Sequence, residues 1–294
     1  MIIIAGQTGT GKTTLALDLA IKYNGELISA DSRQIYTGMD IGTGKVDSVC
    51  DLTLQDTTWM LKGIPIHGIN LIAPSQIFSA GDFAEYGREI ISNIEKRGKT
   101  PILVGGTGFY IKSLIDPDDT VFIPQNKTLR STLEQLSSQE LQDILKKKDN
   151  EKLQVMNNSD RNNPRRLVRA IEVAEWKTNP GTGTKNNNTS PGTIQWIGLS
   201  ANKTTLESRI SGRINKMLDT GLEDEVRILI EKYGWDVPGL QTIGYKEWKS
   251  FLAGEQTIED VKKAIVLSHL QYSRKQMIYL KRFPDIKWQE VTQP

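Results

Sequence analysis

The sequence is poor in the residues that form disulfides and zinc sites. Its 294 residues include one cysteine, Cys50, and two histidines. A single cysteine cannot form a disulfide within the chain, and so few thiol and imidazole ligands argue against a structural zinc site. We therefore interpret Cys50 as a small, partly buried side chain.

Long hydrophobic runs and a strong net charge are also missing. No apolar run approaches the ~18 residues of a transmembrane helix, and the apolar N-terminus is interpreted as a strand rather than a signal peptide. The formal net charge is only +2, so any surface that binds nucleic acid has to be local. We expect a cytoplasmic protein that has no membrane partner.

The apolar N-terminal run leads into a glycine-rich segment, GQTGTGKT, at residues 6–13. Its pattern, G-x-x-x-x-G-K-[ST], allows a tight turn whose N–H groups surround phosphate oxygens, and the helical spacing that follows directs a helix N-terminus at the same anion. A chance match in a glycine-rich turn is the alternative, but the strand before and the helix after favour phosphate binding. We expect Lys12 to reach the terminal phosphates and the Thr13 hydroxyl to bind Mg²⁺. The predicted phosphate-binding residues are Gly6, Gln7, Thr8, Gly9, Thr10, Gly11, Lys12 and Thr13.

Strand and helix patterns alternate through the first part of the chain. Apolar runs at 26–30, 64–72 and 101–104 predict short strands, and helical patterns follow the phosphate loop and the second and third of these runs. This alternation indicates a doubly wound α/β domain with a parallel sheet.

Two loops directly follow predicted strands. Groups just beyond the carboxyl ends of parallel strands face the ligand crevice, so Asp31 in the segment Asp31–Gln34 is expected beside the phosphate loop. An ordinary turn or helix N-cap explains an Asp-Ser pair equally well. The second loop, Gly105–Tyr110, lacks the acid that an ATPase usually carries at this point to help hold Mg²⁺. That absence argues against a motor driven by ATP hydrolysis.

The composition changes from about Asp116 onwards. Residues 127–177 are polar, rich in lysine and helical in pattern, and residues 179–193 form a low-complexity polar stretch that we expect to be a mobile loop. An apolar run at 194–199 predicts a return to the sheet. We therefore predict a core made of residues 1–116 and 194–294, and a helical insertion of residues 117–193.

Basic residues cluster on several predicted helices. Arg165, Arg166 and Arg169 lie together near the start of the last helix of the insertion, and Arg209 and Arg213 lie one turn apart on a later helix. The first of these clusters is either a solvated helix face or a phosphate contact. The final helical segment is either an ordinary helix packed on the core or a nucleic-acid contact, because it interleaves Tyr272 and Tyr279 with Arg274, Lys275, Lys281 and Arg282.

Taken together and in this order, the motifs resemble one family, the tRNA dimethylallyltransferases (tRNA isopentenyltransferases) of bacterial length. The matching segments are GQTGTGKT, ISADSRQIYTGMDIGTGK, FSAGDF, PILVGGTGFY, NPRRLVRAIEV, LESRISGRINKML with GLEDEV, QTIGYKE and YSRKQ. The resemblance implies a P-loop kinase-like core and a helical insertion that holds the tRNA anticodon stem-loop. It also implies Mg²⁺-dependent transfer of a dimethylallyl group from dimethylallyl diphosphate to N6 of the adenosine immediately 3′ of the anticodon.

The resemblance also assigns roles to individual residues. It places Asp31 as the carboxylate that accepts the proton of N6, Thr107 near the acceptor, and Arg213, in preference to Arg209, as a cation on the diphosphate. The residues that it implies for tRNA binding are Asp31, Ser32, Arg33, Gln34, Arg165, Arg166, Arg169, Gln241, Gly244, Tyr245, Lys246, Tyr272, Arg274, Lys275 and Gln276.

Some features depart from the family pattern. Gly44 stands where alanine is common, His67 precedes a glycine where a second histidine is frequent, and the insertion is shorter than usual. The alternatives are a prenyltransferase for free adenine nucleotides, a small-molecule P-loop kinase and an RNA-binding protein with a vestigial P-loop. We expect a monomer, because no long apolar seam indicates an obligate interface.

Overall fold

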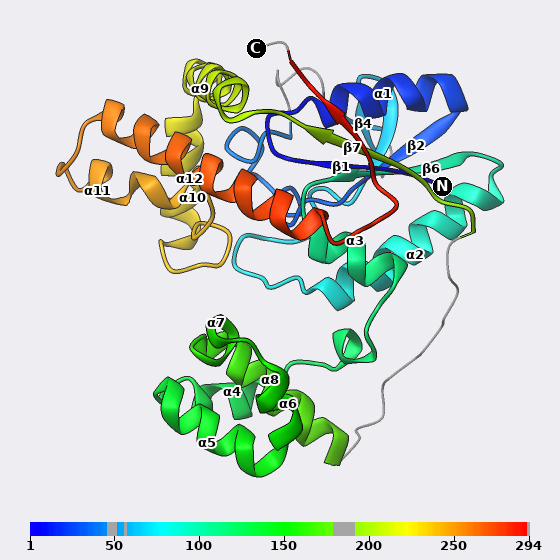
Figure 1. Cartoon of the computed structure of the whole chain (residues 1–294). Helices are drawn as coiled ribbons and strands as arrows, with labels where there is room; N and C mark the ends of the chain where they lie inside the picture. The colour runs from blue at the N-terminus through cyan, green and yellow to red at the C-terminus, as the bar shows by residue number, and fades with distance from the viewer. Residues whose placement is uncertain (46–51, 56–57, 179–191, 293–294) are drawn as a thin grey trace. The chain divides into compact units, whose positions relative to one another are not determined.

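The computed structural model describes residues 1–45, 52–55, 58–178 and 192–292. The expectation for Cys50 falls outside these ranges. So does the expectation for the stretch 179–193, apart from its last two residues. The chain divides into two compact units (Figure 1): unit 1 contains Met1–Asp116 and Ser190–Pro294, and unit 2 contains Pro117–Thr189. No helix in the described part of the chain combines the length and the apolar character needed to cross a bilayer.

Unit 1 is built on one sheet. Over the described residues this sheet has eight strands in the order β3-β4-β5-β2-β6-β1-β7-β8. The strands from β5 to β8 in this order run parallel, whereas β4 is antiparallel to both β3 and β5. The predicted α/β fold with a parallel sheet is confirmed. Strands β3, β4 and β8 were not predicted from the sequence pattern. The strands are β1 (Ile2–Gly6), β2 (Gly25–Ser29), β3 (Leu52–Gln55), β4 (Thr58–Leu61), β5 (Ile64–His67), β6 (Thr100–Gly105), β7 (Gln195–Ser200) and β8 (Lys287–Glu290).

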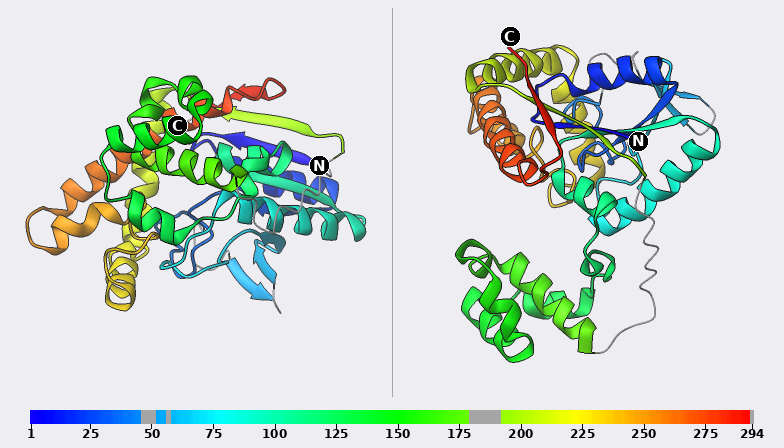
Figure 2. Two further views of the ribbon diagram at one scale, coloured as in Figure 1. Left: turned by 90° about the horizontal axis from the view of Figure 1, so that it is seen from below. Right: turned by 45° about the vertical axis from the view of Figure 1, so that its right-hand side comes forward.

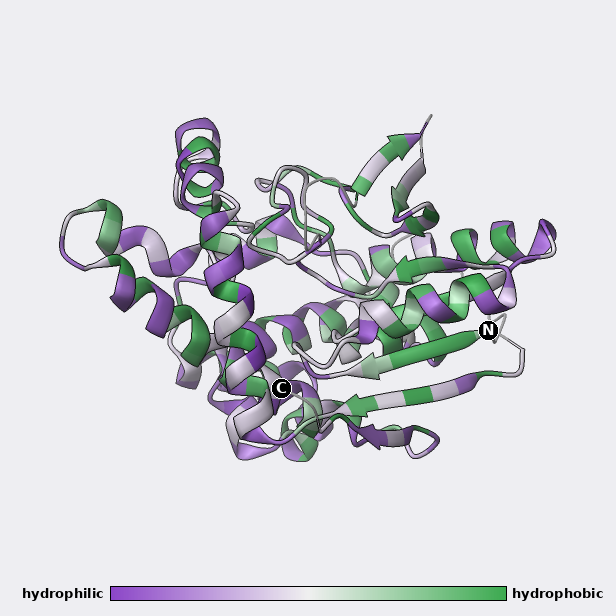
Figure 3. Ribbon diagram, turned by 90° about the horizontal axis from the view of Figure 1, so that it is seen from above, coloured by the Kyte–Doolittle hydropathy of each residue, from purple (hydrophilic) through white to green (hydrophobic). Residues whose placement is uncertain are grey.

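Helices cover both faces of the sheet (Figures 1 and 2). Helix α1 (Lys12–Tyr23) lies on one face, and α2 (Ala80–Lys96) and α3 (Gly108–Ile115) lie on the other. Ala16 and Ala20, one turn apart on α1, join the hydrophobic core of the sheet. Figure 3 shows that β1 is hydrophobic along its length while the helices carry hydrophobic stripes. Unit 1 also contains α9 (Lys203–Asp219), α10 (Leu222–Tyr233), α11 (Lys249–Leu252) and α12 (Ile258–Leu280), and α12 packs against α9.

Unit 2 is helical and has a core of its own. Leu141 and Leu145 of α5, one turn apart, are fully buried together with Leu167 and Ile171 of α8. Pro164 occupies the first position of α8, where its missing N–H costs no hydrogen bond. The helices of unit 2 are α4 (Lys127–Leu133), α5 (Ser138–Lys148), α6 (Asn150–Val155), α7 (Asn158–Arg161) and α8 (Pro164–Thr178).

Candidate active site

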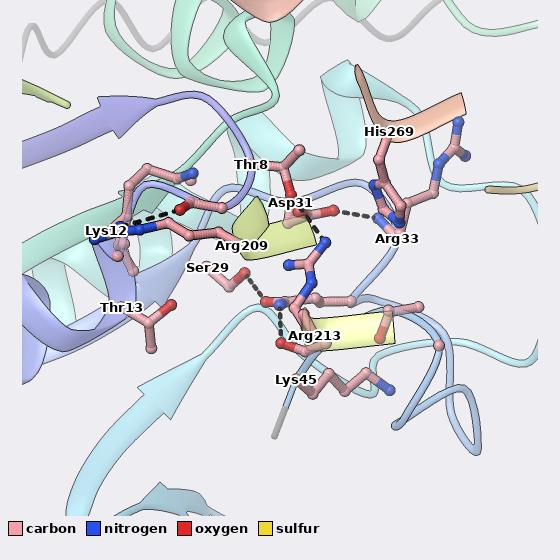
Figure 4. A pocket seen from close by; sticks show the side chains of 18 of the residues that line it. Thr8, Lys12, Thr13, Ser29, Asp31, Arg33, Lys45, Arg209, Arg213 and His269 are labelled. Atoms are coloured by element: carbon pink, nitrogen blue, oxygen red, sulfur yellow. Dashed lines mark hydrogen bonds between the residues drawn. The ribbon is translucent and has the colours of Figure 1, made fainter. Parts of the chain in front are cut away.

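A pocket of about 420 Å³ lies in unit 1, where the loops after β1 and β2 and the end of β6 meet helices α9 and α12 (Figure 4). This is the carboxyl edge of the parallel strands, at which open α/β sheets bind their ligands. Asp31 is the one carboxylate among the described lining residues. The cations that line the pocket are Lys12, Arg33, Lys45, Arg209, Arg213 and Lys216. The arrangement favours an anionic ligand.

Residues 6–13 form the turn between β1 and α1 that the sequence predicts. Gly9 and Gly11 have φ angles of +82° and +81°, in the left-handed region that favours glycine. Gly11 is the N-cap of α1, so the first N–H groups of this helix and the positive end of its dipole lie at the pocket. The turn therefore has the geometry of an anion-binding loop.

The side chain of Lys12 bonds back to the backbone of this loop. Its Nζ donates a hydrogen bond to the carbonyl oxygen of Gln7 over 2.6 Å. Burial lowers the pKa of Lys12 to about 8, the nearby Asp31 acts in the opposite direction, and Arg213 lowers the pKa further. The amine thus carries its charge at some electrostatic cost, which an arriving anion would relieve.

Two arginines of α9 lie against the phosphate loop. Because Arg209 and Arg213 are four residues apart, they lie on the same side of the helix. Nη1 of Arg209 donates to the carbonyl oxygen of Gly9 over 3.2 Å, and Nη2 of Arg213 donates to Oγ1 of Thr8 over 3.1 Å. Both guanidinium groups are therefore held beside the place where a phosphate would bind.

The loops after β2 and β6 are joined at Thr107. Its Oγ1 accepts a hydrogen bond from the backbone N–H of Ser32 over 3.1 Å. The backbone N–H of Arg33 donates to Oδ1 of Asp31 over 2.9 Å, which orients the carboxylate. The structure thus places Asp31 in the pocket wall, whereas Thr107 is not among the lining residues and supports the loop that carries Asp31.

Helix α12 contributes a polar face to the same pocket. Oε1 of Gln276 accepts from the N–H of Thr8 over 2.8 Å, and its Nε2 donates to the carbonyl oxygen of Gly106 over 3.2 Å. Burial raises the pKa of Tyr272, and its hydrogen bonds to Thr107 and Gln276 act against that rise. Because successive helical residues point about 100° apart, the neighbouring Arg274 and Lys275 are exposed to solvent instead.

Residues 42–45 form another wall of the pocket. Glu225, which the sequence did not single out, holds the segment 40–45 in place. The carboxylate of Glu225 on α10 accepts hydrogen bonds from the N–H groups of Asp40, Ile41 and Gly42 over 2.9, 2.8 and 3.1 Å. The signal for this role was present in the segment GLEDEV, but an acid near a helix N-terminus has too many ordinary uses to reveal a partner 185 residues away in sequence.

Tyr245 supports this segment from within the protein. Its side chain is 0% exposed, and its hydroxyl donates to Oε1 of Glu225 over 2.6 Å. A Cβ atom added to Gly42 would come within 2.6 Å of the Tyr245 ring, so this glycine is required for the close approach. The side chain of Tyr245 is therefore inaccessible to RNA, contrary to expectation. Gln241 and Lys246, on either side of it in the sequence, are exposed.

The basic residues of unit 2 differ in what they contact. Arg165 and Arg166 are exposed, and Arg166 forms an ion pair with Asp160. Arg169 instead donates to the carbonyl oxygens of Thr120 and Ile123 over 2.7 and 2.8 Å, and it also pairs with Glu172. The guanidinium of Arg169 therefore holds the start of this unit to α8 rather than presenting an open phosphate contact.

The described residues contain no group of three His, Cys, Asp or Glu side chains that could hold a metal ion. Thr13 is exposed at the N-terminus of α1 and lines the pocket, and Asp31 lines it as well. Oxygen donors of this kind suit Mg²⁺, which binds through few protein ligands and completes its shell with water and substrate phosphates. The donor set fits a cation that is bound together with a diphosphate.

The fold and the pocket define a P-loop protein of the α/β class, with a cation-rich pocket suited to a phosphate-bearing ligand and a carboxylate in its wall. The family model described as "IPP transferase" matches residues 34–283. The chain is 36% identical over 298 residues to the tRNA dimethylallyltransferase of Pediococcus pentosaceus, covering 100% of this chain and 91% of that relative. The chain belongs to this family of prenyltransferases, and the resemblance seen in its motifs is confirmed.

Solved structures agree with this assignment. The chain is 32% identical to the tRNA isopentenylpyrophosphate transferase of Bacillus halodurans, with a TM-score of 0.69, covering 99% of this chain and 89% of that one. It is 27% identical, with a TM-score of 0.79, to a eukaryotic dimethylallyltransferase described as acting on tRNA, covering 99% of this chain and 74% of that one.

Proposed function

We propose that this protein transfers a dimethylallyl group from dimethylallyl diphosphate to N6 of the adenosine immediately 3′ of the anticodon of tRNA, releasing diphosphate. One observation supports the proposal most directly. A single pocket combines the phosphate loop, Lys12 and Arg213 with the carboxylate of Asp31, so a leaving diphosphate and a nucleophile that loses a proton have suitable partners in the same space.

The donor half of the reaction breaks a carbon–oxygen bond, and negative charge develops on the leaving diphosphate. The N–H groups at the start of α1, Lys12 and Arg213 would bind these oxygens, since fixed donors aimed at developing charge lower the barrier most effectively. The contact between Arg213 and Thr8 holds the guanidinium ready for this task. We assign Arg209, which is bonded to the carbonyl oxygen of Gly9, to the support of the loop.

We propose Mg²⁺ as the cofactor. The Thr13 hydroxyl would hold it together with the diphosphate oxygens, because the described residues offer no larger ligand cluster. When bound, the ion would supply positive charge that neutralises the diphosphate.

The acceptor half of the reaction requires a proton to leave N6 as the new carbon–nitrogen bond forms. The lone pair of N6 is delocalised into the adenine ring, so a positioned carboxylate assists the attack. We assign this role to Asp31, whose orientation is fixed by the N–H of Arg33. Thr107, through its bond to the N–H of Ser32, would hold this loop near the acceptor. The adenine has to leave the anticodon loop stack to reach the pocket, as for other enzymes that act on bases.

Exposed polar and basic side chains would hold the rest of the tRNA. The half-buried Tyr272 and the buried Gln276 line the pocket, so we assign them to the flipped nucleotide or to the loops around it. Phosphate contacts position an RNA without reading its sequence, which suits the exposed residues Arg33, Arg165, Arg166, Gln241, Lys246, Arg274 and Lys275. As part of this proposal the protein acts as a monomer, in the cytoplasm where its tRNA substrate is found.

The experiment is incubation with labelled dimethylallyl diphosphate and Mg²⁺, in parallel with unmodified tRNA, with AMP and with ATP alone. Label in tRNA supports the proposal. Label in AMP alone would assign the protein to the prenyltransferases for free nucleotides. ATP consumption without any prenyl transfer would identify a kinase.

A further inference from the structure

His269 is a buried polar side chain in the pocket that the proposed mechanism does not use. It lies on α12, is 9% exposed and lines the pocket. Neither Nδ1 nor Nε2 has a hydrogen-bond partner among the described residues. A buried polar group without a partner destabilises the folded protein, so an unpaired imidazole at a ligand site suggests that the partner arrives with the ligand.

The surroundings of His269 determine which form of its ring is present. Burial lowers its pKa to about 3, and the positive charge of Arg213 contributes to that decrease. The ring is therefore neutral near pH 7, with one N–H donor and one lone pair. Arg213 is also the residue that contacts Thr8 of the phosphate loop, and Figure 4 shows His269 and Arg213 among the same lining side chains.

We infer that His269 is a further binding residue for the donor's diphosphate, donating its ring N–H to a phosphate oxygen beside Arg213. The inference rests on the proposed function for the identity of the anion. Cations outnumber the single carboxylate, Asp31, among the described lining residues, so an anion is the ligand that the pocket favours. A neutral imidazole adds a directional donor without adding repulsion to a site that is already cationic.

The other histidine of the chain provides an internal reference. His67 lies on β5, and its Nε2 is 2.9 Å from Oε2 of Glu26, a buried carboxylate that also pairs with Arg97 and Lys99. Neither His67 nor Glu26 lines the pocket. A ligand that binds in the pocket should therefore perturb the ring of His269 and leave that of His67 unchanged.

The test is nitrogen-15 NMR of the histidine rings in the full chain, with any purification tag removed, during titration with inorganic diphosphate and Mg²⁺. Two ring systems are expected because the chain has two histidines, and a His67→Gln variant assigns them. We expect the ring signals of His269 to shift with saturation of the site while those of His67 stay in place. Unmoved His269 signals at calorimetrically confirmed saturation would overturn the inference.

Substitutions of His269 provide a second test of the same inference. His269→Leu removes the donor, and His269→Asn and His269→Gln each keep an N–H near one ring nitrogen. We expect diphosphate affinity, measured by calorimetry, to fall roughly 10- to 100-fold in the leucine variant and to be retained within about threefold in one amide variant. Wild-type diphosphate affinity in the leucine variant would overturn the inference, whether or not KM for tRNA rises; a rise would mean that His269 contacts the acceptor.

The outcome for the proposed function can be read separately. If the wild-type protein transfers label to tRNA but does not bind diphosphate, only the role of His269 is lost. If it neither transfers label nor binds diphosphate, the proposed function is lost as well.

Discussion

Asp31 is the one carboxylate among the described residues that line the pocket, and the proposed mechanism uses it for a single proton transfer. Replacing it by asparagine keeps the size and the contact with the N–H of Arg33 but removes the base. We expect turnover to fall by about 10²- to 10⁴-fold, with the affinity for tRNA unchanged. Single-turnover rates and tRNA binding measured on the same variant separate the two effects. Weaker binding with normal turnover of the bound complex would show that Asp31 is an RNA contact instead.

Lys12 gives the site a dependence on pH. Its pKa in the free protein is lowered to about 8, so the amine is charged below this pH and loses its charge as the pH rises through it. We expect kcat/KM for the donor to decline above pH 8, because this parameter reports ionisations of the free enzyme. In Lys12→Arg the guanidinium stays charged, so any activity that remains should lack this decline. A decline that persists in the arginine variant belongs to another group.

Single residues differ in how well the sequence predicts their place. The glycine spacing of the phosphate loop fixes where Lys12 lies, because a turn between a strand and a helix has few solutions. Tyr245 could not be placed in this way. Its motif marks it as functionally relevant, but only the packing of α10 against the segment 40–45 determines that its hydroxyl bonds Glu225 inside the protein.

At the scale of elements, the segment 40–45 is held by contacts with α10 and the connector that carries Tyr245. Tyr245→Phe removes one buried hydroxyl and leaves Glu225 with one bond fewer. We expect the free energy of unfolding to fall by about 1–3 kcal/mol, as measured by urea titration, and tRNA affinity to stay within about twofold. Tyr23→Phe, which removes the hydroxyl of a tyrosine that is 41% exposed, is the matched control. A loss of tRNA affinity without a loss of stability would restore Tyr245 as an RNA contact.

The elements also show the limits of local pattern. Strands β1, β2 and β6 are buried and continuously apolar, which is why their runs can be recognised. Strands β3 and β8 are mostly exposed and only four residues long. Such short segments offer too few residues for a strand pattern to stand out from the neighbouring loops. The pattern also misses the first turns of α12. The sequence predicts the final helix over residues 265–283, whereas α12 begins seven residues earlier, at Ile258, after a capping box of Thr257 and Asp260.

At the scale of the whole molecule, the proposal gives the helical unit the task of holding RNA. Arg165 is exposed on this unit, and its loss should remove one phosphate contact. We expect Arg165→Ala to weaken tRNA binding about 3- to 10-fold and to reduce the slope of log affinity against log salt by about one, with donor kinetics unchanged. Arg227→Ala, which removes an exposed arginine that pairs with Glu223 on α10, is the control. Equal effects of the two variants would mean that the binding is non-specific.

The most direct test of the central claim uses a synthetic anticodon stem-loop, labelled dimethylallyl diphosphate and Mg²⁺. One stem-loop carries adenosine 3′ of the anticodon, and a matched one carries purine riboside, which lacks only the N6 amine. The account predicts label in the adenosine stem-loop, none in the purine stem-loop, and one diphosphate released for each group transferred. Label in the purine stem-loop, or diphosphate release that does not depend on the amine, would contradict it.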